Sequence, residues 1–344
     1  MTGERTGFDY DSKIEAPKFA VEKILIAGNR GPCAGVNMAL EAANKVLSIV
    51  NGREKVWTNW PVVNNRPITE ELTNRGLKNF NNDWNLVPDA SIVLFSAHGV
   101  TLEHHRIAEK KNCLVIDTTC LLVTKVHDLV KTAQYEGLKI VYIGRKGHPE
   151  TVGVMSEVEP GKILLVEQAK DVADLPIGTG ENYIVYSQTT LMPDEVDDVE
   201  KELALRFADI EIPDKLGICY ATYSRQKAVE KLIETGIDLL LVVGSPESHN
   251  SQMLKNKGER HDVKSFLIDY PWELSGAWFS GVESVGITSG ASVLDRFMDP
   301  VADWIRTKSP QAIVEFQEQV KKEPQDAMYP LPKESIAAIR ARYL

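Results

Sequence analysis

The sequence predicts an α/β protein built from three pseudo-repeated lobes, each with a small, mostly parallel sheet, around one common centre. Short apolar segments alternate with amphipathic helical segments along the chain, which is typical of parallel sheets covered on both faces. Three isolated cysteines, Cys33, Cys120 and Cys219, recur at intervals of 87 and 99 residues. Similar polar loops follow each cysteine. Together these observations indicate three similar units.

The expected strands are continuous apolar runs. They lie at 23–28, 92–96, 113–117, 139–144, 162–167, 183–187, 238–244, 266–269 and 284–288. The expected helices are segments whose apolar residues recur every three or four positions. They lie at 36–50, 121–136, 193–207, 225–235 and 292–307.

The spacing of the cysteines predicts the domain boundaries. We expect a flexible leader over 1–21, lobes over 22–118, 119–217 and 218–308, and a C-terminal segment over 309–344 that packs back on one of the lobes. Each lobe then contributes one cysteine to the centre.

Composition and charge exclude several classes of function. The 344 residues carry a formal net charge of −10, which argues against non-specific nucleic-acid binding because that requires a basic surface. No apolar run approaches the roughly 18–20 residues that cross a bilayer. The charged N-terminus lacks the apolar core of a signal peptide, so we expect a cytoplasmic protein without membrane contact.

Each of the three cysteines directly precedes a helical pattern. Cys33 lies in GNRGPCAGV, a glycine-bracketed turn between an apolar strand and a helix. The N–H groups of a first helical turn favour a thiolate or an anionic ligand. A small buried cysteine is the alternative reading for any one of these positions taken alone.

Polar loops recur in register with the cysteines. About thirty residues after each cysteine come VVNNR, GHPE and SPESHN, and nearly seventy residues after come SAHG, SQTT and TSGAS. Ligands of open parallel sheets gather at the carboxyl ends of the strands. We therefore expect three cysteines and six polar loops to meet at one site.

Three cysteines without a CxxC motif do not resemble a structural zinc site, which has four ligands in closely spaced pairs. Three thiolates suit a 4Fe–4S cluster with one iron free of protein ligands, and loss of that open iron would leave 3Fe–4S. The fourth cysteine, Cys113, falls inside an expected strand, and we assign it to the core.

The loops supply candidate donors and acids, each with a structural alternative. His98 is a candidate anion donor or a satisfied strand-end histidine. His148 and Glu150 in GHPE offer a donor beside a carboxyl, as a proton relay needs, or a helix start with an acidic first turn. We interpret the other histidines as surface or helix-face residues: His104, His105, His127 and His261.

Hydroxyl and amide side chains complete the candidate chamber. Gln188, Thr189 and Thr190 either cap the helix that begins at 193 or orient a substrate. Ser248, Asn250 and Ser292 are candidates to hold phosphate oxygens, and Ser292 is also a plausible N-cap of the last helix.

These motifs carry a resemblance to a known family. RGPCAGV, SAHGV, DTTCLLVTKVH, GHPE, QTTL, ICYATYSRQ, VVGS…SHNS and TSGAS occur in an order that closely resembles the LytB/IspH family of 4-hydroxy-3-methylbut-2-enyl diphosphate reductases. The resemblance spans roughly 23–331. It implies three α/β lobes around an iron–sulfur cluster held by the three cysteines, and the last step of the non-mevalonate isoprenoid pathway.

The resemblance also implies residue roles and partners. In the family the allylic hydroxyl of the diphosphate substrate meets the free iron, and two electrons and two protons remove it as water, giving isopentenyl and dimethylallyl diphosphate. By matching motifs, Glu150 donates a proton while His148 and Thr189 orient the hydroxyl. An external carrier such as ferredoxin or flavodoxin supplies the electrons. The substrate site would comprise His98, Asn64, Gln188, Thr190, Ser248, His249, Asn250 and Ser292.

The sequence departs from the family pattern at several positions. Asn64 stands where the family has histidine, His249 where it has serine, Val293-Leu294 where Ala-Pro is usual, and Pro32 where an aromatic residue is common. We expect His249 to restore the charge that Asn64 cannot carry, since charged donors to phosphate are stronger. The alternatives are a paralogue with the same chemistry on another hydroxylated substrate, and a non-enzymatic iron–sulfur redox sensor.

Overall fold

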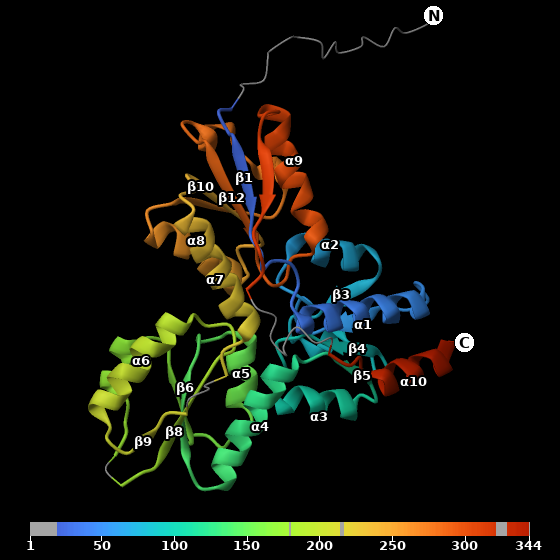
Figure 1. Ribbon diagram of the computed structural model, residues 1–344. Helices are drawn as coiled ribbons and strands as arrows, with labels where there is room; N and C mark the ends of the chain where they lie inside the picture. The colour runs from blue at the N-terminus through green and yellow to red at the C-terminus, as the bar shows by residue number, and fades with distance from the viewer. Residues whose placement is uncertain (1–18, 179, 214–216, 321–328, 344) are drawn as a thin grey trace, which may run out of the picture.

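The computed structural model describes residues 19–178, 180–213, 217–320 and 329–343. The chain forms three lobes that surround a common centre, and each lobe has its own sheet (Figure 1). All the paired strands of the three sheets are parallel. The predicted α/β class with small parallel sheets is confirmed.

Lobe 1 has a four-stranded sheet in the order β3-β2-β4-β5. Its strands are β2 (Val56–Thr58), β3 (Leu77–Asn79), β4 (Ile92–Phe95) and β5 (Leu114–Asp117). The apolar runs at 92–96 and 113–117 therefore form strands as expected. The sequence prediction missed β2 and β3, which have three residues each and too little apolar content to stand out.

Lobe 2 has a four-stranded sheet in the order β7-β6-β8-β9. Its strands are β6 (Lys139–Ile143), β7 (Ile163–Val166), β8 (Tyr183–Ser187) and β9 (Ile210–Glu211). The first three match predicted apolar runs. The two-residue strand β9 was not predicted.

Lobe 3 has a five-stranded sheet in the order β11-β10-β12-β1-β13. Its strands are β1 (Lys23–Ile26), β10 (Leu239–Val243), β11 (Lys264–Ile268), β12 (Ser284–Ser289) and β13 (Ile313–Phe316). Figure 1 shows β1, in blue, among the orange and red strands of this sheet.

The lobe boundaries expected at 22 and 309 do not match this sheet. We expected β1 in lobe 1 and β13 in a separate tail, but β1 lies between β12 and β13 in lobe 3. The cysteine spacing misplaced β1 because the helix after Cys33 packs in the core of lobe 1, whereas the strand before it pairs elsewhere. The tail strand was missed because its side chains are mostly exposed.

The helices cover the sheets and begin near the centre. They are α1 (Ala34–Val50), α2 (Arg66–Asn74), α3 (Leu102–Lys110), α4 (Leu121–Tyr135), α5 (Pro149–Met155), α6 (Pro193–Arg206), α7 (Tyr220–Glu234), α8 (His249–Arg260), α9 (Asp299–Lys308) and α10 (Lys333–Tyr343). Cys33, Cys120 and Cys219 are the N-cap residues of α1, α4 and α7, and no thiol makes a capping hydrogen bond.

The expected start of the last helix and the expected end of the leader were wrong, and one of the two alternatives left open for residues 188–190, the capping role, is not found. The helix expected over 292–307 begins only at Asp299, with Met298 as its N-cap, so Ser292 does not cap it. Met192 rather than a residue of 188–190 is the N-cap of α6. Most of the expected leader lies outside the described residues, but Val21 is fully buried and Phe19 stacks on Phe279 at 4.7 Å between ring centroids.

The C-terminal helix α10 packs on lobe 1. Ile336 and Ile339 are buried in the same core cluster as the apolar face of α1, and α10 lies beside lobe 1 in Figure 1. The helix therefore closes the core of a lobe that lies far from it in sequence.

Replacing Ile339 with alanine is expected to lower the free energy of unfolding by about 2–5 kcal/mol, because truncating a buried isoleucine leaves a cavity. Ile339 is fully buried. Urea denaturation followed by circular dichroism measures the change, and Ile313→Ala on an exposed strand position is the matched control. A midpoint equal to that of the control variant would show that α10 does not stabilise lobe 1.

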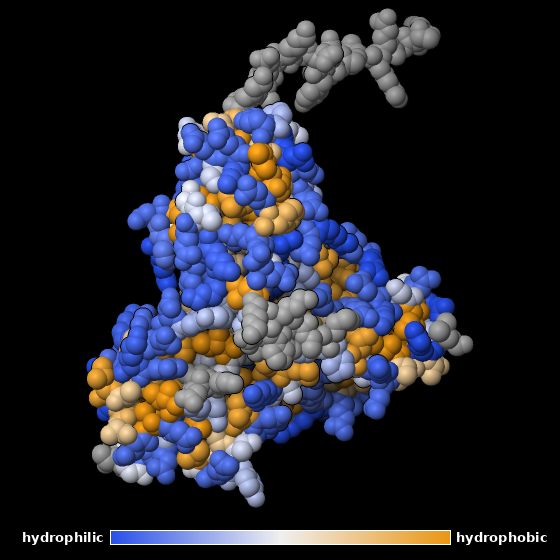
Figure 2. All heavy atoms as spheres, in the orientation of Figure 1, coloured by the Kyte–Doolittle hydropathy of each residue, from blue (hydrophilic) through white to orange (hydrophobic). Residues whose placement is uncertain are grey.

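Among the described residues, no helix is both long enough and apolar enough to cross a membrane. On the face shown in Figure 2, apolar side chains form patches separated by polar ones.

Candidate active site

The three lobes share one cavity at the centre of the molecule. Nearly all of the predicted site residues line it, although they come from loops and helix starts far apart in sequence. They are Cys33, Asn64, His98, Cys120, His148, Glu150, Thr189, Thr190, Cys219, Ser248, His249, Asn250 and Ser292. The expected meeting of cysteines and polar loops is therefore found.

The three cysteines face the same space and none is in a disulfide. A Cβ added to Gly35 would lie 2.9 Å from Cys120 Sγ, so the start of α1 approaches this thiol closely because residue 35 has no side chain. Burial, followed by the neighbouring Cys33, raises the pKa of Cys120 to about 12 and that of Cys219 to about 11. Thiols in such a site ionise only with a cation to hold them.

Among the described residues, no group of three or more His, Cys, Asp or Glu side chains is placed to hold a metal ion. Cys33, Cys120 and Cys219 nevertheless line the same cavity, and thiolates are the ligands that hold iron–sulfur clusters.

Tyr329 contacts the same region, and the sequence analysis did not single it out. Its ring would lie 3.8 Å from a Cβ on Gly35, and burial together with the nearby cysteines raises its pKa above the usual range. The tail after β13 thus returns to the cysteines before α10 begins. The YPLP segment was the available signal, because an aromatic residue beside two prolines suggests a fixed turn.

His98 lies at the carboxyl end of β4 and is held by its neighbours. Ser96 Oγ is 3.2 Å from its Nδ1, and Asn64 Nδ2 is 3.2 Å from its Nε2. Burial lowers the pKa of His98 to about 4. The ring is therefore neutral at pH 7.

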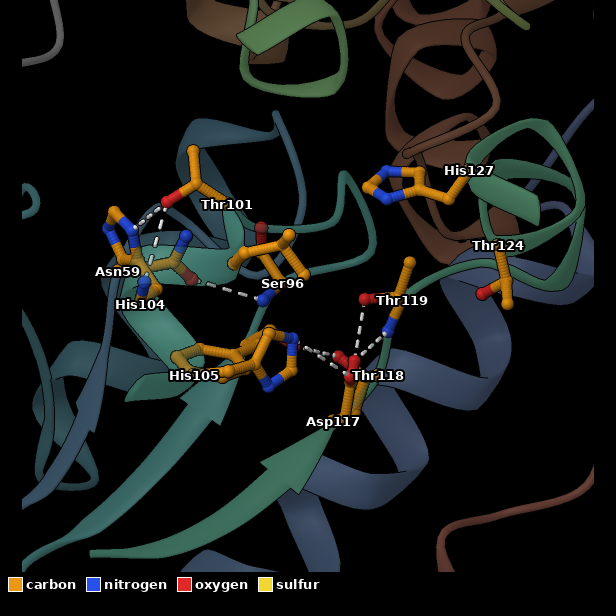
Figure 3. Close-up of polar contacts among 12 residues, drawn as sticks. Asn59, Ser96, Thr101, His104, His105, Asp117, Thr118, Thr119, Thr124 and His127 are labelled. Atoms are coloured by element: carbon orange, nitrogen blue, oxygen red, sulfur yellow. Dashed lines mark hydrogen bonds and ion pairs between the residues drawn. The ribbon is translucent and has the colours of Figure 1, made fainter. Parts of the chain in front are cut away.

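A second layer of polar contacts fixes the loop that carries His98. Figure 3 shows Asn59 accepting a hydrogen bond from the backbone N–H of Ser96, at 3.2 Å. In the same view, Thr101 contacts the ring and backbone of His104 at the start of α3. Both ends of the loop are anchored, so the His98 ring is presented to the cavity in one orientation.

Glu150 is the buried acid of the cavity. It accepts hydrogen bonds from the backbone N–H of Thr189 to Oε1 at 2.7 Å and contacts the Thr189 hydroxyl through Oε2 at 3.0 Å. Burial raises the pKa of Glu150 to about 7, and these hydrogen bonds oppose that shift. The carboxyl can therefore hold a proton near neutral pH and pass it to the adjacent hydroxyl.

His148 lies at a helix start and also faces the cavity, so both roles considered for it, helix cap and cavity donor, are compatible with its position. It is the N-cap of α5, where its Nδ1 accepts from the Glu150 N–H at 3.2 Å. Its ring also lies edge-on to His98, with centroids 5.9 Å apart. Burial, then His98 and His249, lowers its pKa to about 3.

The start of α8 presents unsatisfied polar groups to the cavity. Within the described part of the chain, His249 Nε2 and both polar side-chain atoms of Asn250 are buried without a hydrogen-bond partner. Ser248 Oγ caps the helix by accepting from the N–H and hydroxyl of Ser251, which leaves its own proton for a ligand. Buried groups of this kind at a helix N-terminus suit an anion.

Two predicted ligand-binding residues also make hydrogen bonds within the protein. The Ser292 hydroxyl donates to the Asn64 carbonyl at 2.9 Å and so links lobe 3 to lobe 1. The Thr190 hydroxyl accepts from Gln188 Nε2 at 2.8 Å.

The assignment of Gln188 to the substrate site is corrected. Its side chain is fully buried, and its Oε1 accepts from the Arg145 N–H and the Thr151 hydroxyl. It therefore orders the loop before α5 from behind the cavity. The amide hydrogen-bonds equally well to protein and to substrate, so the sequence alone could not separate these roles.

Two other residues differ from expectation. Cys113 precedes β5 and is only half-buried against a lobe 1 core cluster. His127 is not a surface residue, because it is only 7% exposed and its Nδ1 lies 2.6 Å from Glu157 Oε1.

Three parallel α/β lobes around a cavity with three thiols, three imidazoles and a buried acid define a redox enzyme of the α/β class. The family model described as "LytB protein" matches residues 24–306. The chain belongs to the LytB family.

Curated relatives match nearly end to end. The chain is 38% identical over 314 residues to a 4-hydroxy-3-methylbut-2-enyl diphosphate reductase of Francisella philomiragia, covering 90% of this chain and 96% of that protein. It is 39% identical over 300 residues to the enzyme of the same name from Acidithiobacillus ferrooxidans, covering 86% and 94%.

A solved structure shows the same architecture. The E-1-hydroxy-2-methyl-but-2-enyl-4-diphosphate reductase of Plasmodium falciparum superposes with a TM-score of 0.87 at 29% identity, over 94% of this chain and 99% of that one.

Proposed function

We propose that this protein is a 4-hydroxy-3-methylbut-2-enyl diphosphate reductase of the non-mevalonate isoprenoid pathway. It replaces the allylic C–OH bond with C–H, consuming two electrons and two protons and releasing water. The products are isopentenyl and dimethylallyl diphosphate. The observation that carries the proposal is the convergence of three free thiols and a buried acid in one cavity.

Cys33, Cys120 and Cys219 would hold a 4Fe–4S cluster as thiolates. When bound, such a cluster supplies electrons and, at the iron without a protein ligand, a Lewis acid. Burial raises the pKa of Cys120 and Cys219, so the bound iron would have to offset the cost of ionising these thiols.

The diphosphate end of the substrate would lie against the start of α8. Asn250 Nδ2 and His249 Nε2 are unpartnered there, and Ser248 has a hydroxyl proton to donate. His98 lies opposite, with its ring held by Ser96 and Asn64. Its Nε2 accepts from Asn64 Nδ2, so His98 would donate to the diphosphate only after it gains a proton or Asn64 turns away. These donors and the positive end of the α8 dipole would together hold an anion.

Glu150 would supply a proton to the departing oxygen. The Thr189 hydroxyl lies 3.0 Å from Glu150 Oε2 and donates to it. When the carboxyl is protonated, this bond would reverse, and the Thr189 hydroxyl would donate to a substrate oxygen. His148 would orient the substrate hydroxyl from the same helix start. Water is excluded because Glu150 is only 1% exposed.

The electrons would come from an external low-potential carrier such as ferredoxin or flavodoxin, which places the enzyme in the cytoplasm with that carrier. Anaerobic turnover of reconstituted protein with a chemical reductant and 4-hydroxy-3-methylbut-2-enyl diphosphate tests the proposal directly. Five-carbon diphosphate products are the expected result. An intact cluster without product would overturn the substrate assignment.

A second candidate is a paralogue that reduces another hydroxylated substrate. Asn64 and His249 favour this alternative, since both line the cavity and both depart from the family pattern. Turnover with a different allylic alcohol, in the absence of turnover with the diphosphate, would identify this case.

Replacing His249 with serine is expected to weaken diphosphate binding at pH 6 by about tenfold, because a charge-assisted hydrogen bond contributes roughly 1.5–3 kcal/mol. Burial lowers the pKa of His249 in the empty cavity, and a bound anion would favour its charged form. Calorimetry with inorganic diphosphate measures the affinity. His261→Asn, on the exposed end of α8, is the control. Unchanged affinity in His249→Ser would refute the compensation of Asn64 by His249.

A further inference from the structure

His127 occupies the junction between lobe 1 and lobe 2, outside the set of residues that line the cavity. We propose that His127 is a positioning residue whose ring fixes the loop carrying His98 relative to the helix carrying Glu150. The activity part of this inference rests on the proposed function.

One edge of the His127 ring is anchored. The residue lies on α4, and its Nδ1 is 2.6 Å from Glu157 Oε1, which identifies Nδ1 as the donor to that carboxylate. The Glu157 side chain is 7% exposed, and its Oε2 lies 3.9 Å from Lys131 Nζ. The ring therefore has one orientation, with Nε2 directed away from Glu157.

The opposite edge of the ring lies between two glycines. A Cβ on Gly99 would lie 3.2 Å from His127 Nε2, and a Cβ on Gly153 would lie 3.3 Å from its Cε1. Gly99 also has a φ of +82°, which glycine adopts without strain. Figure 3 shows the ring projecting from α4 toward the loop after β4.

Each glycine adjoins a residue that faces the cavity. Gly99 directly follows His98, and Gly153 follows Glu150 by three positions, which places both on one face of α5. The Leu102 N–H also donates to Ser156 Oγ at 3.3 Å, so the same loop and helix meet a second time.

The ring thus spaces two groups that belong to different lobes. Without the His127 ring, the distance between the loop that carries His98 and α5 would change by a fraction of the ring width. A misplacement of about 1 Å costs roughly 10²-fold in rate when reacting groups must be aligned.

The product ratio distinguishes positioning from folding. Reduction of the allyl unit delivers a proton to either of two carbons, giving isopentenyl or dimethylallyl diphosphate. A variant that merely contains less folded enzyme makes both products in the original ratio. A shift of the allyl unit relative to the group that protonates its carbons changes the ratio.

The first test is His127→Asn in the reconstituted holoenzyme. The asparagine amide keeps a donor near the Nδ1 position for Glu157 and removes the edge between the glycines. We expect turnover per cluster to fall about 10–100-fold, KM to change less than about threefold, and the product ratio to shift at least about twofold. His261→Asn, an exposed histidine at the C-terminal end of α8 and outside the cavity, is the control and should change none of these.

The second test is a double-mutant cycle with Gly153→Ala. In the wild-type background the added methyl would lie 3.3 Å from the ring Cε1, so the ring must shift by a few tenths of an ångström and turnover falls. In the His127→Asn background the same methyl fills the vacated space and restores part of the turnover. This reversal of sign is the coupling expected of residues in direct contact.

Hydrogen exchange supplies a readout that needs no turnover. Amides of α5 should exchange faster in His127→Asn than in wild type, while those of β6 stay unchanged. Additive effects in the cycle, an unshifted product ratio or unchanged α5 exchange would each overturn the proposal. Absence of product in the wild type would refute the proposed substrate. Hydrogen exchange of α5 would still test the positioning role of His127, because it needs no turnover.

Discussion

Glu150→Gln is expected to lower turnover by about 10²–10⁴-fold, because a positioned general acid contributes that range. Glutamine keeps the acceptor for the Thr189 N–H but cannot release a proton to the Thr189 hydroxyl. Affinity for inorganic diphosphate should stay within about threefold, since Glu150 is not among the groups proposed to donate to the diphosphate. Steady-state kinetics and calorimetry measure the two quantities.

The pH dependence follows from the same residue. Burial raises the pKa of Glu150 to about 7, so the proton-donating form predominates below that pH and is lost above it. Turnover limited by this step should therefore fall as pH rises through about 7. The residual activity of Glu150→Gln should not show this decrease as the pH rises.

Stability supplies the control for this variant. A carboxyl whose folded-state pKa is raised binds more protons when folded than when unfolded, so the free energy of unfolding decreases as pH rises from about 4.5 to about 7. Glu150→Gln removes this loss and should be at least as stable as wild type at pH 8. Turnover close to that of Glu109→Gln, an exposed control on α3, would exclude Glu150 as the acid.

The sequence was sufficient to predict which loops line the central cavity, because cysteines and polar loops recurred at strand ends. Parallel strands bring such loops to one edge of each sheet, and the cavity contains nearly all of them. The long apolar strands, such as β6 and β10, were equally predictable from their composition.

What the sequence could not predict depends on contacts between distant segments. β1 joins the sheet of lobe 3 although its following helix packs in lobe 1, and no local pattern encodes such a crossing. Tyr329 returns to the cysteines from the tail. His127 reads as an ordinary helix-face residue until Gly99 and Gly153 are placed beside it.

Replacing any one of Cys33, Cys120 or Cys219 with serine is expected to abolish turnover and most of the bound iron. Iron–sulfur clusters are held by thiolates, and two remaining cysteines leave the cluster with too few ligands. Iron content per chain and the visible absorption of the reconstituted protein measure the loss.

Because of where these cysteines lie, replacing them with serine should affect folding little. Each is a helix N-cap whose thiol makes no capping hydrogen bond, and serine is among the residues that cap helices best, by about 0.5–2 kcal/mol over alanine. The serine variants should therefore keep their helix content. Cys113→Ser, which alters a half-buried cysteine outside the cavity, should keep iron and turnover. Retained iron in a variant of the three central cysteines, or lost iron in Cys113→Ser, would contradict the ligand assignment.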